Sequence, residues 1–200
     1  MKRVLIAILL TAVCQSAETD YKVYELGKTA RVDDKGKCLD MKGNLLPGKA
    51  ELQKPDEFED YATIGTRCIN GEAIEERGYY ESGELGYIGP LKNSKYEGVG
   101  KSFYVSGKLK SESSFKNGTF EGLAKFFYES GKLKSEIPFK NGEREGEIKL
   151  FRENGKILGV FTYKNNKVIR GVCYETNGEK RPFTKAEQEH WDLNEEVTCD

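Results

Sequence analysis

A block of 24 residues repeats in tandem, and it constrains the fold more than any single motif in the chain. The three clearest copies read GVGKSFYVSGKLKSESSFKNGTFE from Gly98, GLAKFFYESGKLKSEIPFKNGERE from Gly122 and GEIKLFRENGKILGVFTYKNNKVI from Gly146. A fixed period of this length is typical of one supersecondary unit stacked on copies of itself. Such an array builds a surface, whereas catalysis needs a unique constellation of residues that tandem copies do not supply. We therefore expect the repeats to serve binding or scaffolding.

Turn pairs in step with the repeat predict that each unit is a β-hairpin. Asn-Gly and Ser-Gly pairs between β-rich runs favour tight hairpin turns, because those turns need a positive φ. One series comprises Ser82-Gly83, Ser106-Gly107, Ser130-Gly131, Asn154-Gly155 and Asn177-Gly178. The other comprises Asn70-Gly71, Asn93-Ser94, Asn117-Gly118, Asn141-Gly142 and Asn165-Asn166. The sequence thus predicts a mostly β fold, an elongated antiparallel meander of about ten strands from Cys68 to Phe183.

A two-residue turn at Ser106-Gly107 fixes a trial register for the hairpins. In that register the glycine that heads each unit faces an aromatic residue. The three pairs are Gly98 with Phe115, Gly122 with Phe139 and Gly146 with Tyr163. An aromatic ring that covers a cross-strand glycine fixes the register of a sheet, so we interpret these six residues as structural.

The opposite face of the predicted sheet is polar and carries the binding candidate. Its facing pairs are Lys101 with Glu112, Lys125 with Glu136, Phe103 with Lys110 and Phe127 with Lys134. Phe103, Phe127 and Phe151 recur on every second strand, about 10 Å apart. Lys110 and Lys134 flank two of the rings, so the row could contact an extended polymer, a lipid surface or a partner strand. The simpler interpretation, which we favour, is that the lysine stems cover the rings as a thin apolar layer.

The first residues have the pattern of a secretory signal peptide, residues 1–16. Lys2 and Arg3 form a basic start, and an apolar stretch from Val4 to Val13 is too short to span a bilayer. We expect a periplasmic or secreted mature chain with no transmembrane segment. A lipoprotein cut before Cys14 and a buried N-terminal helix are the alternatives.

Four cysteines follow that segment: Cys38, Cys68, Cys173 and Cys199. An even number of cysteines in an exported chain predicts two disulfides, with three connectivities open. Sequence distance favours pairing of neighbours, Cys38 with Cys68 and Cys173 with Cys199. A zinc site is disfavoured, because no two of these cysteines have close metal-ligand spacing.

The repeats divide the chain into four segments. These are the signal peptide at 1–16, an irregular β segment at 17–66, the hairpin repeats at 67–183 and a C-terminal helix and tail at 184–200. Thr184 and Glu187 form a capping box that predicts a short helix from Lys185 to Asn194. Such a helix would cap the array, which needs an end unit to shield its last strand edge.

Charge and motif content argue against nucleic acid binding and catalysis. Removing Lys2 and Arg3 from the 32 basic residues leaves 30 against 33 acidic residues, a net charge of −3. Nucleic acid needs a concentrated basic surface instead. His190 is the one histidine and has no nucleophile or metal partner near it in the sequence. No phosphate-binding loop, zinc-protease motif or EF-hand occurs, so we expect no enzyme activity, no cofactor and no metal.

The repeat resembles the bacterial variant of the MORN repeat over roughly residues 68–180. The shared pattern is G-x-x-x-x-[YF]-[YFW]-x-[SN]-G-K-L-x-x-E-x-x-[YF]-K-N-G-x-x-x-G, which the copies from Gly98 and Gly122 fit closely. The third copy departs from it, with Arg152 in place of an aromatic residue and Asn166 in place of the turn glycine. Many proteins with this repeat are labelled antitoxins of the YwqK type, so the resemblance implies an antitoxin or immunity role.

The residues themselves favour a different function first: an exported, non-catalytic protein that presents a long β surface to another protein of the cell envelope. The antitoxin role, in which the chain neutralises a toxic partner, is the alternative. A second alternative is association with a lipid membrane surface, suggested by the repeat's full name, membrane occupation and recognition nexus, and by its lysines. The net negative charge argues against that alternative.

Overall fold

The computed structural model describes residues 21–55, 61–184 and 199, and these residues form strands and turns with no helix. The strands are β1 (Lys22–Glu25), β2 (Ala30–Val32), β3 (Cys38–Asp40), β4 (Lys49–Pro55), β5 (Thr63–Ile69), β6 (Glu72–Tyr79), β7 (Leu85–Lys92), β8 (Lys95–Tyr96), β9 (Gly98–Phe103), β10 (Leu109–Lys116), β11 (Thr119–Phe120), β12 (Gly122–Phe127), β13 (Leu133–Lys140), β14 (Glu143–Arg144), β15 (Gly146–Phe151), β16 (Ile157–Lys164), β17 (Lys167–Tyr174) and β18 (Lys180–Pro182).

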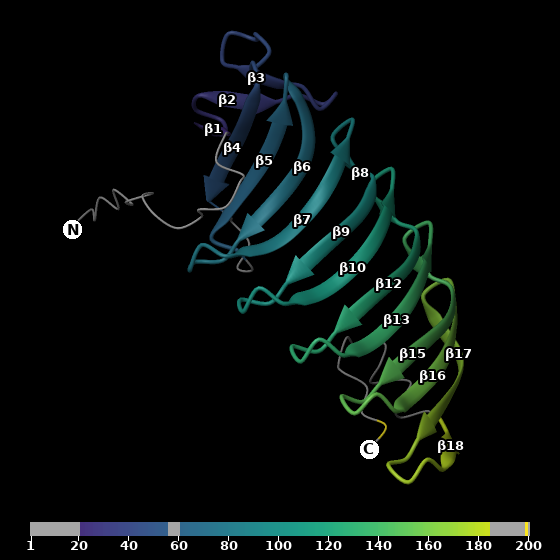
Figure 1. Cartoon of the computed structure of the whole chain (residues 1–200). Coiled ribbons are helices and arrows are strands. Elements are labelled where there is room, and N and C mark those ends of the chain that lie inside the picture. Colours follow the sequence, from purple (N-terminus) through teal and green to yellow (C-terminus); the bar gives the residue numbers. More distant parts are fainter. Residues whose placement is uncertain (1–20, 56–60, 185–198, 200) are drawn as a thin grey trace, which may run out of the picture.

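Sixteen of these strands form one long sheet, in the order β1-β4-β5-β6-β7-β9-β10-β12-β13-β15-β16-β17-β18 with β8, β11 and β14 beside it. Figure 1 shows the sheet as a single twisted layer that the chain follows from one end to the other. The predicted antiparallel meander is therefore confirmed. One pairing was not expected: β1 lies parallel to β4 at the N-terminal end.

Two kinds of turn alternate along the meander. The asparagine turns are tight, and both central residues have positive φ, 53° at Asn117 and 84° at Gly118, which is the geometry that Asn-Gly favours. The serine turns are longer than predicted. At the first of them the Tyr104 N–H donates to the Lys108 carbonyl at 2.8 Å, and the Gly107 N–H donates to the Tyr104 carbonyl at 2.8 Å.

The longer turn corrects the predicted pairing next to it. Phe103 faces Leu109, not Lys110, and Phe127 faces Leu133, not Lys134. The cause is a bulge, which places one extra residue on one strand beside the turn. Further from the turn the register is as predicted: the pairs include Gly98 with Phe115, Gly122 with Phe139 and Gly146 with Tyr163.

The heading glycines have a different physical reason from the one predicted. Gly98 has a φ of 108°, a conformation that favours glycine. A Cβ added there would meet Pro90 at 3.3 Å, whereas a Cβ on Gly100 would meet the Phe115 ring at 2.9 Å. The ring therefore covers Gly100, and the backbone conformation accounts for Gly98. Gly122 and Gly146 likewise have positive φ, 88° and 112°.

Two apolar clusters lie at opposite ends of the sheet, and each includes a disulfide. The N-terminal cluster contains Leu52 and the Cys38–Cys68 disulfide, which ties the separate β2–β3 hairpin to β5. The C-terminal cluster contains Phe161 and the Cys173–Cys199 disulfide. The predicted neighbour pairing of the cysteines is thus confirmed.

Three predictions fall on other parts of the chain. The signal peptide at 1–16, the helix from Lys185 to Asn194 and His190 lie outside the residues that the structure describes. Cys199 is described, and its sulfur lies close to Gly159, 3.2 Å from where a Cβ would stand. Cys199 therefore lies on the face of the sheet that carries Phe161.

Candidate interaction surface

The face of β9–β16 that carries Lys101, here called the outer face, has a row of alternating charges. The row crosses β9, β10, β12, β13 and β15 in register, and each member pairs with the next: Lys101, Glu112, Lys125, Glu136 and Lys149. The Lys101 ammonium lies 3.1 Å from the Glu112 carboxylate, and their side chains are 45% and 35% exposed. Exposed pairs of this kind contribute well under about 1 kcal/mol each, so the row is open to a partner.

The predicted phenylalanine row lies on the same face, because it alternates with the same strand positions as the charges. Phe103, Phe127 and Phe151 are each half-buried. The two lysines predicted beside them lie elsewhere. The Lys110 and Lys134 ammonium groups lie 5.9 Å and 5.8 Å from the ring centroids of the tyrosines one residue after Phe103 and Phe127, at distances suited to cation–π contact.

Sequence reasoning missed the most exposed apolar residues of the outer face. Val99 and Leu123 are 51% and 44% exposed, and each lies two residues before a lysine of the charged row. The period of two along a strand places them on the outer face. The same period of two is present in the sequence. The outer face therefore combines a charged row with apolar residues on both sides, except in the third copy, where Glu147 occupies the position of Val99 and Leu123.

Tyrosine hydroxyls connect successive repeats at the end of the hairpins near the serine turns. Tyr104 Oη donates to the Phe127 carbonyl at 2.6 Å, and Tyr128 Oη donates to the Phe151 carbonyl at 2.7 Å. Tyr80 makes the equivalent bond to Phe103 at 2.7 Å. In the third copy the guanidinium that replaces the tyrosine keeps the link, since Arg152 donates to the Tyr174 carbonyl at 2.8 Å.

Glutamates connect the repeats at the opposite end, beside the asparagine turns. The backbone N–H of Asn141 donates to Glu121 Oε2 at 2.8 Å. The same bond joins Asn117 to Glu97 at 2.8 Å and Asn165 to Glu145 at 3.0 Å. A carboxylate that accepts a backbone N–H makes a charge-assisted hydrogen bond. Each glutamate therefore holds the turn of the following repeat.

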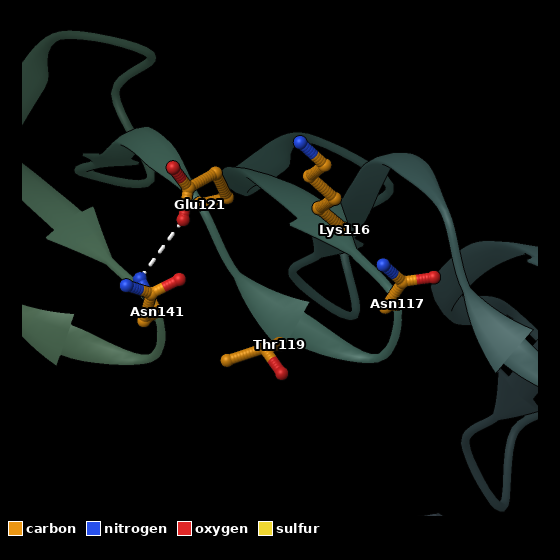
Figure 2. A pocket seen from close by; sticks show the side chains of 5 residues that line it. All are labelled: Lys116, Asn117, Thr119, Glu121 and Asn141. Atoms are coloured by element: carbon orange, nitrogen blue, oxygen red, sulfur yellow. Dashed lines mark hydrogen bonds between the residues drawn. The ribbon is translucent and has the colours of Figure 1, made fainter.

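A polar hollow of about 240 Å³ lies between two of these turns. Figure 2 shows its lining, in which Glu121 reaches the backbone nitrogen of Asn141 while Lys116, Asn117 and Thr119 stand around the opening. Thr119 is one of the residues that line the hollow. Lysine and glutamate occupy the equivalent positions, Lys95 and Glu143, in the neighbouring repeats.

The N-terminal end of the sheet holds a cluster of buried charges. The Arg67 guanidinium lies 2.8 Å from the Glu51 carboxylate and 3.5 Å from Glu75, and these side chains are 9%, 5% and 19% exposed. The Arg77 guanidinium lies 2.6 Å from Glu75. Burial, followed by the charge of Glu51, raises the pKa of Tyr79 to about 12. Each charge has an opposite neighbour, so the cluster is a structural network.

A half-buried polar group lies on the other face. The hydroxyls of Tyr87 and Tyr96 both donate to the carboxylate of Glu76. Burial and these hydrogen bonds raise the pKa of both phenols, so both stay protonated near neutral pH. In the described part of the chain, no group of three or more His, Cys, Asp or Glu side chains is placed to hold a metal ion.

Comparison with known families identifies the repeat. Residues 96–117, 120–141 and 144–165 match the MORN repeat variant. These three tandem segments are similar to MORN repeats. Each matched MORN segment runs from a short two-residue strand, through one long hairpin, to the asparagine of the next turn. No curated protein matches the chain. Among residues 21–55, 61–184 and 199, no helix could cross a membrane.

Proposed function

We propose that this chain is an exported, non-catalytic binding protein whose MORN repeats present the outer face of β9–β16 to another protein. One observation carries the proposal: an in-register row of charges, exposed at Lys101 and half-buried at the other four positions, crosses five strands, with Val99 and Leu123 exposed beside it. Rigid, regularly spaced charged and apolar groups favour a protein partner, because they fix register as well as affinity.

The two disulfides support export. Disulfides persist in oxidising compartments and are rare in the cytosol. The signal-peptide pattern at 1–16 agrees with such a location. The antitoxin role and the lipid association stay predictions from the sequence, since no contact described above favours either of them.

Cross-linking in cell-envelope extract tests the proposal. The double variant Leu123→Glu/Lys125→Glu places charge on an exposed apolar position and reverses one member of the row. We expect it to lose a partner that the unchanged chain captures. Val105→Glu is the matched control, because Val105 is 55% exposed in a serine turn away from the row. Capture of no specific partner, or equal loss in both variants, would refute the proposal.

A further inference from the structure

We infer that the partner reaches this protein through an acidic segment in the polyproline II conformation, which lies along the asparagine-turn edge of the outer face. The inference rests on the proposed function and names the chemistry of the segment that this surface recognises. Four observations carry it: a row of lysines, its spacing, the adjacent apolar residues and the polar hollow between the turns.

A lysine stands at the end of the long strand that precedes each asparagine turn of the repeats. The members of this edge row are Lys92, Lys116, Lys140 and Lys164, and all are exposed. None of them has an ion-pair partner among the described residues. The nearby glutamates Glu97, Glu121 and Glu145 instead accept hydrogen bonds from turn N–H groups. The ammonium groups of the edge row are therefore available to carboxylates from outside.

The spacing of the edge row selects the conformation of the segment. Successive members are two strands apart, which is about 10 Å. Polyproline II has three residues per turn and rises about 3.1 Å per residue, so every third residue lies on one side, about 9 Å apart. In a β-strand, side chains at every third position point to opposite faces in turn, so half of the carboxylates would point away from the lysines. An acidic residue at every third position of a polyproline II segment therefore matches the row.

An α-helix with acidic residues seven positions apart would also match the spacing of the edge row. The polar hollow favours polyproline II over such a helix. Lys116, Asn117 and Thr119 offer an ammonium, an amide and a hydroxyl at the opening (Figure 2). A polyproline II backbone has no internal hydrogen bonds, so its carbonyls and N–H groups can use these side chains. The backbone of a helix is already paired internally, so it could not use these side chains, which would stay bonded to water.

Apolar side chains border the edge row on the outer face. Pro138 lies two residues before Lys140, and Leu123 faces Pro138 on the neighbouring strand. Val99 faces Ser114, which lies two residues before Lys116. Proline rings between the acidic residues of the segment would cover this apolar border. Docking of proline-rich segments on apolar surfaces is an established recognition mode, and it costs little conformational entropy because the segment is preformed.

The test is a fluorescence anisotropy titration of the full oxidised chain with a labelled peptide of four Glu-Pro-Pro units, one for each lysine of the row. We expect about a tenfold weaker Kd when three lysines of the row are neutralised, since each exposed contact contributes modestly. The variant is Lys116→Gln/Lys140→Gln/Lys164→Gln. The matched control, with the same repeat spacing at the serine turns, is Lys108→Gln/Lys132→Gln/Lys156→Gln, which should bind as the unchanged chain does. Circular dichroism checks that all three chains fold alike.

Three comparison probes decide the chemistry. A peptide of the same composition with its four glutamates clustered should bind more weakly, and so should a helical peptide with glutamates seven residues apart. Polygalacturonate, an acidic polysaccharide, should bind more weakly as well. Tighter binding of any of these probes, equal loss in both lysine triples, or no binding of the Glu-Pro-Pro peptide would overturn the inference. If the peptide fails while the cross-linked partner is still captured through the outer face, the inference fails and the proposed function stands.

Discussion

The ends of the sheet and its middle are held together in different ways. At each end a cluster of buried side chains surrounds a disulfide, with Leu52 in one cluster and Phe161 in the other. From β9 to β15 the buried positions hold mostly small residues, such as Gly100, Ser113 and Ala124. There the strands are joined by the backbone pairing and by recurring tyrosine and glutamate hydrogen bonds.

The difference shows how a repeat array separates stability from binding. Middle repeats contribute similar amounts, because each repeat contacts only its neighbours. The ends have no neighbour on one side and need additional apolar burial and covalent links. With its contacts internal to the sheet, the middle keeps an outer face that is free to bind. The predictions below test this comparison, beginning with the largest effect.

Arg67→Met tests whether the N-terminal end depends on its buried charges. The change leaves the buried carboxylate of Glu51 without its cation, while Glu75 keeps the Arg77 guanidinium at 2.6 Å, so we expect a loss of about 4 kcal/mol in the free energy of unfolding. Urea denaturation followed by circular dichroism measures it. Lys101→Met is the control in the middle, where the 45% exposed side chain should cost less than about 1 kcal/mol. Equal losses would contradict the comparison.

Removal of the C-terminal disulfide tests the covalent link at the other end. The double variant Cys173→Ala/Cys199→Ala opens a loop with a sequence separation of 26, which should cost about 3 kcal/mol. The measurement is the urea midpoint of the oxidised proteins. An unchanged midpoint would show that the end needs no covalent link.

Tyr128→Phe tests whether the middle repeats share their stabilisation evenly. The change removes the hydrogen bond to the Phe151 carbonyl and should cost about 1 kcal/mol. Tyr104→Phe removes the equivalent bond one repeat earlier and should cost the same amount. A clear difference between the two in thermal unfolding would mean that the repeats are not equivalent.

Alkaline pH should weaken the N-terminal end by a smaller amount. The pKa of Tyr79 is raised from 10.0 to about 12 by burial and then by Glu51, so the unfolded chain loses this proton before the folded chain does. The contribution of Tyr79 to stability is full below pH 10 and declines as the pH rises towards 12. Denaturation midpoints at pH 9 and pH 11.5 should differ less in Tyr79→Phe than in the unchanged chain. An identical pH dependence in both would reject this assignment.

Much of the repeat architecture could be predicted from the sequence, because turn chemistry and periodicity are local. The asparagine turns, the pairing of Gly98 with Phe115 and the partners of Cys38 and Cys173 were predicted correctly. The predicted serine turn is one residue shorter than the observed turn. A bulge depends on the hydrogen bonds of the neighbouring residues, and a turn pair alone does not reveal it.

The hydrogen bonds between successive repeats could not be predicted from the sequence. The predicted register gives the hydroxyl of Tyr104 no partner, and the family pattern marks Arg152 only as a departure from an aromatic residue. Both make the same kind of bond to the next repeat. Such bonds connect residues about one repeat apart across a twisted sheet, and a register on paper does not show them. The phenylalanine row lies on the predicted face, although Phe103 and Phe127 face Leu109 and Leu133 in place of the predicted lysines. Its binding role stays a prediction.

Deletion of one whole repeat tests the central claim, that the middle repeats are interchangeable units between two locked ends. Removing residues 122–145 joins Glu121 to Gly146 and keeps the period, so Glu121 should hold the turn at Asn165. We predict that the shortened, oxidised chain has no free thiol among its four structural cysteines and unfolds cooperatively with a β-sheet circular dichroism spectrum. A shortened chain with free thiols and no β-sheet spectrum would contradict the account.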